Sequence, residues 1–456
     1  MQVDTLITGA AVITMDEDRR ILRDGVIAVQ GDRIVAVGPS EELARRYTAD
    51  TTVSGEGFLA TPGLVNGHAH ITETLIRGFL PEDLPFDEEL MEWVIPLYKG
   101  HDEAEQSLSA QLAVVAMLRT GTTTFIEAGT VIALDAVMEA IAPIGIRGRV
   151  GRWCEDRAWD RAADQTGMTE TACAALDADC ARWPDDGRRL SVWPNLIGHS
   201  TGTDALWQHA SALAQREGLG VSAHMSPVLD DPAWYLEHEG KRPIVHLSEI
   251  GVLGPWLNLV HMVQIDEAEL ALVAASGTNV THCPGAAIKC GFGTTRDGLF
   301  PEMDAAGVNL VLGTDGADSH DMVRAMALMA GLFKDGRKDR GLFPAAKVLE
   351  MATINGARAL GLGETIGRLA PGYKADIVLH ALDRPEWRPL NNPVNQLVWS
   401  ASGASVHSVW VDGERVVEAY RCTKIDEGAL YARAQVAAQQ ILSRSGLPAH
   451  GAWSAA

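Results

Sequence analysis

Short apolar runs alternate with longer, helix-like segments between residues 59 and 312, and this alternation is the strongest constraint on the fold. Nearly continuous apolar strands separated by helices are typical of a parallel sheet that is buried on both faces. Eight strand-and-helix units in one stretch predict a TIM-type barrel. The eight expected strands are Leu59–Val65, Thr122–Ile126, Arg147–Trp153, Leu190–Leu196, Gly220–Ala223, Leu257–Val260, Asn279–Thr281 and Val308–Leu312.

The two ends of the chain are also β-rich, and they lie on either side of the barrel region. We expect the two pieces to meet as one small β-sandwich. The predicted fold class is therefore α/β, with a (β/α)8 barrel and a sandwich built from both termini. The expected division is a composite β-sandwich domain from residues 1–58 and 366–425, a catalytic barrel from 59–365, and a helical tail from 426–456.

Composition and charge limit the kinds of partner and the cellular location that we expect for this chain. The net charge of −22 argues against nucleic acid or an anionic membrane surface as a partner. The chain has no apolar run long enough to span a membrane and no secretion signal at its N-terminus. Its six cysteines include no Cys-x-x-Cys pair, which is typical of reduced thiols. We expect a cytoplasmic protein that acts on a neutral small molecule.

Histidine and aspartate residues close four of the expected strands. His68 and His70 follow the first strand, and their i, i+2 spacing points both side chains the same way. His224, His261 and Asp315 end the fifth, sixth and eighth strands. In an α/β barrel the chemistry lies at these carboxyl ends. A single histidine there is more often structural, but five such residues in register predict a metal site.

His68, His70, His224 and Asp315 together offer three imidazoles and one carboxylate. This set suits one divalent ion, zinc first, with iron, manganese or cobalt as alternatives. Such an ion makes hydroxide available near neutral pH. We expect Asp315 to accept the proton of the bound water and His261 to orient that water or polarise the bond under attack. The fourth strand offers no lysine, which argues against a carbamate-bridged pair of metals.

The ordered motifs resemble those of the amidohydrolase superfamily, most closely its mononuclear branch. The matching segments are Pro62-Gly-Leu-Val-Asn-Gly-His-Ala-His70, Gly121-Thr-Thr-Thr124, Val280-Thr-His-Cys-Pro284, Leu312-Gly-Thr-Asp-Gly316 and Gly367-Arg-Leu-Ala-Pro-Gly-Tyr-Lys-Ala-Asp376. That branch holds cytosine, guanine and adenosylhomocysteine deaminases, s-triazine chlorohydrolases, and hydrolases of phenylureas and thiocarbamates. The resemblance implies a distorted barrel, the same four metal ligands, His261 beside the hydrolytic water, and a homo-oligomer, dimeric or larger.

The chain departs from this pattern at two places. Deaminases of the branch usually carry His-x-x-Glu after the fifth strand, whereas this segment reads His224-Met-Ser-Pro227. Proline cannot move a proton to a ring nitrogen. Relatives often show Pro-Thr-Ser-Asn where this chain has Pro284-Gly-Ala-Ala287, so a more apolar pocket is expected. Both losses favour hydrolysis of an amide, urea or carbamate-like C–N bond by metal-bound hydroxide, a reaction that needs no ring protonation.

Two other functions remain open. One is an aminohydrolase or dehalogenase of an N-heterocycle such as a purine, pyrimidine, pterin or triazine, in which Glu127, Glu155 or His199 replaces the lost glutamate. The other is an inactive relative that serves as a binding protein. Residues near the other strand ends are candidates for substrate contact, namely Trp93, Glu127, Trp153, Glu155, His199 and His282, with Trp159 similarly placed.

Overall fold

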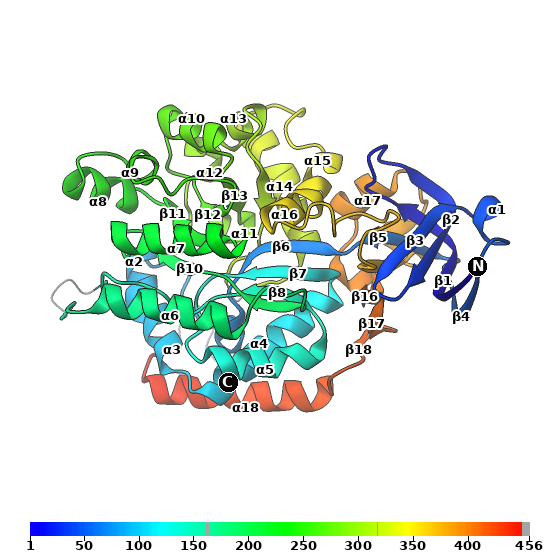
Figure 1. Ribbon diagram of the computed structural model, residues 1–456, viewed down its shortest axis with the longest axis horizontal. Helices are drawn as coiled ribbons and strands as arrows, with labels where there is room; N and C mark the ends of the chain where they lie inside the picture. The colour runs from blue at the N-terminus through cyan, green and yellow to red at the C-terminus, as the bar shows by residue number, and fades with distance from the viewer. Residues whose placement is uncertain (160–163, 317, 449–456) are drawn as a thin grey trace.

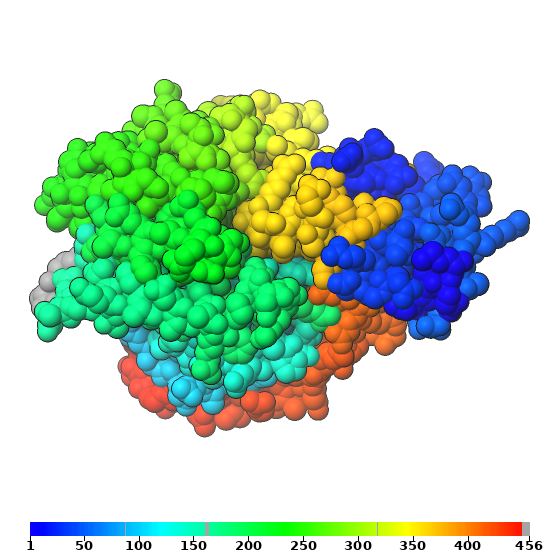
Figure 2. Space-filling model, viewed as in Figure 1, coloured from blue at the N-terminus to red at the C-terminus, as the bar shows by residue number. Residues whose placement is uncertain are grey.

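The computed structural model describes residues 1–159, 164–316 and 318–448. Its ribbon has the terminal strands gathered at one end and the barrel at the other, with the two joined side by side (Figure 1). The space-filling view shows the same two bodies in broad contact (Figure 2). The predicted fold class, a distorted barrel with a β-sandwich from both termini, is confirmed.

The barrel wall consists of two parallel sheets. A parallel bridge between Ala69 and Asp315 joins the first barrel strand to the end of the last one. The fourth expected strand is present in two pieces, interrupted at Trp193-Pro194. Proline has no N–H for a sheet ladder, which accounts for the interruption. The strands are β6 (Leu64–Ala69), β7 (Thr122–Glu127), β8 (Arg147–Val150) and β9 (Leu190–Val192) in one sheet, and β10 (Asn195–Gly198), β11 (Val221–Met225), β12 (Leu257–His261), β13 (Asn279–His282) and β14 (Leu310–Leu312) in the other.

The first expected barrel strand, Leu59–Val65, is divided between the two bodies. Its first half is β5 (Phe58–Pro62), which pairs with strands of the terminal sheet, and only β6 belongs to the barrel. Gly63 connects the two strands. Only glycine fits at this position, because a Cβ atom there would lie 2.0 Å from Thr123 Oγ1. We therefore propose the domain boundary at Gly63 rather than after residue 58.

Strands from both ends of the chain form one sheet of nine. β5 links them, since it pairs in parallel with β1 and antiparallel with β15. The strands are β1 (Gln2–Ile13), β2 (Ile21–Gln30), β3 (Arg33–Pro39), β4 (Thr48–Ser54), β5, β15 (Ile377–Ala381), β16 (Val406–Val411), β17 (Glu414–Glu418) and β18 (Arg421–Cys422). Apolar side chains such as Ile7, Ile27 and Ile377 pack in the core of this body.

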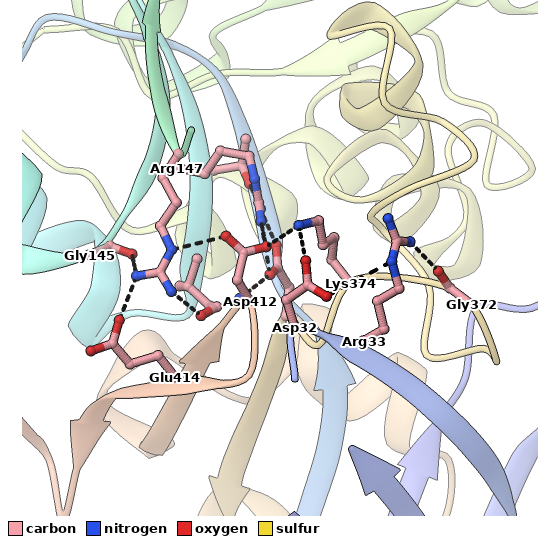
Figure 3. Close-up of polar contacts among 12 residues, drawn as sticks. Asp32, Arg33, Gly145, Arg147, Gly372, Lys374, Asp412 and Glu414 are labelled. Carbon is pink, nitrogen blue, oxygen red and sulfur yellow. Dashed lines mark hydrogen bonds and ion pairs between the residues drawn. The ribbon is translucent and has the colours of Figure 1, made fainter. Parts of the chain in front are cut away.

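A buried ionic network ties the barrel to this terminal sheet (Figure 3). Arg147 on β8 is 4% exposed, and its guanidinium contacts Asp376 and lies 2.5 Å from Asp412. Arg189 also pairs with Asp412, at 2.9 Å. Burial alone would lower the pKa of Arg147, but Asp376 and Asp412 outweigh it and raise that pKa. The arginine therefore stays charged at the junction.

Helices cover the barrel, and the helical tail packs beside one of them. In the tail, α18 (Glu427–Ser445) contacts α4 (Glu103–Arg119) through an Arg444–Glu105 pair at 2.7 Å. No described helix has both the length and the apolar character needed to cross a membrane. The other barrel helices of eight residues or more are α5 (Leu134–Ile141), α6 (Met168–Arg182), α7 (Asp204–Glu217), α8 (Asp230–His238), α10 (Glu267–Ser276) and α14 (Met322–Gly336). Shorter helices include α1 (Ser40–Leu43), α2 (Phe86–Glu89), α3 (Ile95–Gly100), α9 (Pro243–Glu249), α11 (Pro284–Lys289), α12 (Thr294–Asp297), α13 (Phe300–Ala305), α15 (Ala345–Met351), α16 (Ile354–Ala359) and α17 (Pro393–Trp399).

Candidate active site

The four expected metal ligands converge at the carboxyl ends of the barrel strands. The Nε2 atoms of His68 and His224 lie 3.2 and 3.4 Å from the Nε2 of His70. Asp315 Oδ1 lies 2.9 Å from His70 Nε2 and 3.3 Å from His68 Nε2. His68 lies in β6, His70 directly follows it, His224 lies near the end of β11 and Asp315 lies in the loop after β14, so only the closed barrel brings the four together.

His261 belongs to the same cluster. Its Nε2 lies 3.8 Å from Asp315 Oδ2, and its ring lies over that of His224 with centroids 5.5 Å apart. His68, His224, His261 and Asp315 offer ligand atoms that all lie within 4.8 Å of one another. His261 is therefore near enough either to ligate an ion or to contact a water held beside it.

The hydrogen bonds behind these rings fit a metal ion. His224 Nδ1 lies 2.8 Å from the Ile197 carbonyl oxygen, which can only accept, so this nitrogen donates. His70 Nδ1 lies 2.5 Å from Glu73 Oε1 and 2.7 Å from the Tyr98 hydroxyl. With the proton on Nδ1, the Nε2 atoms of His70 and His224 turn their lone pairs toward the cluster, an arrangement that a cation stabilises. The donor set therefore fits one divalent metal.

The charges of His224 and Asp315 favour the same state. Burial would lower the pKa of His70, but Glu73 and Asp315 outweigh it and raise that pKa, so this ring must lose its second proton to bind a metal. Burial, together with the neighbouring histidines, holds the pKa of His224 well below its usual range, so this ring is neutral. Burial would raise the pKa of Asp315, but His261, His68 and His70 outweigh it and keep that pKa well below its ordinary value. A neutral imidazole beside an ionised carboxylate is the form in which both groups bind metals.

The backbone is strained where it aims these side chains. His199, His261 and Asp315 have φ values of 51°, 76° and 66°, in the left-handed region that side chains other than glycine rarely adopt. Each such residue costs about 1–3 kcal/mol and persists only where the surrounding structure enforces it. The strand-end loops at the cluster are thus held in one arrangement.

A largely apolar cavity opens beside the cluster. Its wall includes His70, His224, His261 and Asp315. Aromatic rings form much of the remaining described wall, and they suit a flat, apolar substrate. These rings are Phe86, Tyr98, Trp153, Trp159 and Phe292, accompanied by the aliphatic Ile76, Leu80, Val94 and Ile197.

Two of the six residues expected to contact substrate lie on this wall, His199 and Trp153, as does Trp159. His199 is the most specifically placed. Its Nδ1 lies 2.8 Å from Asp231 Oδ2, and its ring is stacked on that of His224 with centroids 5.5 Å apart. Asp231 also accepts the backbone N–H of Ser226 at 2.6 Å, which fixes the carboxylate that orients His199.

The other four residues lie outside the described cavity wall. Trp93 packs against Phe79 with ring centroids 5.7 Å apart. The carboxylate of Glu127 folds back onto its own loop, where it accepts the Gly129 N–H at 2.5 Å and the Thr130 hydroxyl at 2.7 Å. Glu127 was expected at the substrate because it follows a strand, but the position alone does not show that its own loop uses the carboxylate.

Glu155 and His282 also face elsewhere. Glu155 lies on a separate hollow, together with Met168 and Asp179. His282 is fully buried against Phe300, with ring centroids 4.2 Å apart, and burial lowers its pKa to about 3. His282 is the last residue of β13, and because side chains alternate along a strand, such a residue can point into the core instead of toward the cavity.

Most of the other wall residues were not expected from the sequence, and Glu73, Tyr98 and Glu89 are among them. Of these three, only Glu73 had a usable signal, because it follows His70 by three residues and can return to that ring within one turn. Tyr98 and Glu89 come from the helical segment 86–100, which no strand-end rule covers. Their position on the wall depends on how that segment folds over the barrel mouth.

Comparison with known proteins identifies the family. A model described as "Amidohydrolase family" matches residues 59–416, well over half of the chain. The chain belongs to the amidohydrolase family. It is accordingly a hydrolase of carbon–nitrogen bonds other than peptide bonds. Residues 25–49 also match a bacterial imidazolonepropionase-like composite domain.

Several relatives resemble this amidohydrolase over nearly their whole length. A 5-methylthioadenosine/S-adenosylhomocysteine deaminase from Syntrophobacter fumaroxidans is 33% identical over 444 residues, which cover 96% of this chain and 99% of the relative. A crystal structure of an adenosine deaminase from Xanthomonas campestris with bound zinc is 30% identical, with a TM-score of 0.88, and the match covers 97% and 99% of the two chains. A zinc complex of atrazine chlorohydrolase from Arthrobacter aurescens, 22% identical with a TM-score of 0.86 over 95% and 100%, shares the fold.

Proposed function

We propose that this amidohydrolase is a zinc-dependent aminohydrolase that releases ammonia from an amino-substituted N-heterocycle of the purine class. The observation that carries this proposal is His199, which lies on the cavity wall beside His224 and is held from behind by Asp231. The imidazole can donate a proton, a role that the usual glutamate plays in related deaminases and that Pro227 cannot play here. The whole-length similarity to proteins named as adenosine-type deaminases supports the same class of substrate. This evidence favours the heterocycle hypothesis over the amide or urea hydrolase expected from Pro227 alone.

His68, His70, His224 and Asp315 would hold the zinc ion. When bound, the ion supplies hydroxide near neutral pH by lowering the pKa of water. Zinc is proposed because the donor set suits it and because two similar solved structures contain it. The backing of His70 by Glu73 and Tyr98, and of His224 by the Ile197 carbonyl, would keep their Nε2 lone pairs aimed at the ion.

Three side chains would act on the reacting atoms. Asp315 Oδ2, on the side of His261, would accept the proton released from the attacking water. His261 Nε2 would donate a hydrogen bond to the group that develops negative charge. His199 would carry a proton on Nε2 toward a ring nitrogen of the substrate, while Asp231 stabilises the charged imidazole through Nδ1. General acid catalysis of this kind contributes about a hundredfold to ten-thousandfold to the rate.

A second candidate function rests on Pro227 itself. If His199 only orients the substrate, ring protonation is missing, and the cluster would instead cleave an amide, urea or carbamate-like C–N bond. Asp315 would then pass its proton directly to the leaving nitrogen. The expected homo-oligomeric state and cytoplasmic location also stay predictions.

A two-panel assay separates the two functions. The zinc-loaded protein is incubated with aminopurines, aminopyrimidines and aminotriazines in one panel, and with matched aryl amides and ureas in the other, with ammonia or amine release as the measurement. We expect release of ammonia from aminopurines, and loss of turnover after removal of the metal with a chelator. Turnover confined to the amide and urea panel would overturn the proposal, and so would full activity of metal-free protein.

A further inference from the structure

Glu89 is a carboxylate on the cavity wall with no partner in the described part of the chain. It ends α2 and is only 9% exposed, so it is more than nine-tenths buried. No hydrogen bond or ion pair satisfies its side-chain oxygens among the described residues, although its backbone N–H bonds the Pro85 carbonyl. Its oxygens are not among the fully enclosed side-chain atoms that lack a partner, so they are open to the cavity, where a donor on a ligand can reach them.

The surroundings of Glu89 are more acidic than basic. Burial raises its pKa, Lys289 opposes that effect, and Asp318, Glu73 and Glu82 add to it. Lys289 is itself paired with Asp318 at 2.9 Å, so its charge is already compensated. A positive charge that reaches Glu89 would therefore meet more carboxylates than amines at this part of the wall.

Aromatic rings lie on the same part of the wall. Phe86, at the other end of α2, meets Phe292 edge to face with ring centroids 5.2 Å apart, and both line the cavity with Glu89. A cation is stabilised by the face of an aromatic ring as well as by a carboxylate. A carboxylate among phenylalanines fits an alkylammonium, whose stem is apolar and whose head is charged.

We propose that Glu89 is a specificity residue that binds a protonated amine carried on a side chain of the substrate. This inference rests on the proposed function, since it gives that heterocycle a cationic arm remote from the amino group that is removed. It also replaces the neutral substrate expected from the sequence with a cationic one. The ammonium would donate to the Glu89 carboxylate while its alkyl stem lies against Phe86 and Phe292.

Two adenines of equal size test this proposal. One carries an aminopropyl chain on N9 and the other carries a butyl chain, so they differ by an ammonium in place of a methyl group. The zinc-loaded protein is assayed with both near pH 8, for kcat/KM of ammonia release and, independently, for Kd from tryptophan fluorescence. We expect the aminopropyl compound to be favoured at least about tenfold, as one charge-assisted hydrogen bond predicts.

Two variants assign the preference to Glu89. We expect Glu89→Gln to bring the ratio of the two compounds close to one, because the amide keeps the shape and removes the charge. Glu88→Gln makes the same chemical change at the preceding, exposed residue and should keep the wild-type ratio. Melting temperatures of both variants check that they are folded.

The outcomes separate this inference from the proposed function. A wild-type Kd ratio near one would overturn the role of Glu89, as would a preference that Glu89→Gln retains. If neither compound releases ammonia, the proposed function fails with these substrates, whereas the two Kd values still decide whether Glu89 binds the ammonium.

Discussion

At the scale of single residues, His199 carries the clearest prediction for catalysis. His199→Gln keeps a polar side chain but cannot carry a proton at the Nε2 position. We expect kcat to fall by about a hundredfold to ten-thousandfold, with a much smaller change in KM. Asp231→Asn should lower kcat in the same direction because it removes the charge that stabilises the imidazole. Steady-state kinetics on an aminopurine measure both effects. A rise in KM with kcat unchanged would show that His199 binds the substrate but does not transfer a proton.

His282 gives a prediction for the dependence of stability on pH. Its folded pKa is lowered to about 3 by burial, whereas an unfolded histidine titrates near 6.5. The unfolded state therefore binds more protons between these values, so this residue removes stability as the pH falls from about 6.5 toward 3, by at most about 1.4 kcal/mol per pH unit. His282→Leu should flatten the slope of unfolding free energy in that window.

Denaturant titrations at several pH values measure that slope. His209→Leu is the matched control, because His209 is only partly buried and pairs with Asp177 on the surface. It should leave the acid slope close to that of the wild type. An unchanged slope in His282→Leu would mean that other buried histidines account for the acid sensitivity.

At the scale of elements, the passage from β5 to β6 depends on Gly63. Gly63→Ala would push a methyl group into Thr123 of β7, whose Oγ1 lies 2.0 Å from the position of that Cβ. Overpacking of this kind costs about 1–3 kcal/mol. Gly285→Ala is the control, because its nearest neighbour, the Leu328 side chain, is 3.9 Å away. Thermal melting compares the two, and equal melting temperatures would show that the strand junction tolerates a side chain.

At the scale of the whole molecule, Arg147 joins the barrel to the terminal sheet. Arg147→Met would leave Asp376 and Asp412 buried beside an uncharged side chain. Removing one partner of a buried pair costs about 3–5 kcal/mol. Arg182→Met breaks an exposed pair with Asp135 and should cost less than about 1 kcal/mol. Urea titrations of both variants test the contrast, and a small loss for Arg147→Met would mean that Arg189 and Lys374 compensate.

The sequence by itself determined the class of fold and the candidate ligands. Alternation of apolar runs and helical segments is a local pattern, and a closed parallel barrel is the arrangement that buries such strands on both faces. Barrel chemistry lies at the carboxyl ends of strands, and the residues found at those ends in the sequence are His68, His70, His224, His261 and Asp315.

Only the tertiary structure decided which other residues reach the cavity. His282 closes a strand as His224 does, yet its side chain enters the core, and Glu127 is used by its own loop. Glu89 and Tyr98 come from a helical segment with no strand to locate them. The physical reason is that the local sequence pattern locates the end of each strand. The direction of each side chain depends instead on loop conformation and on contacts between segments far apart in the chain.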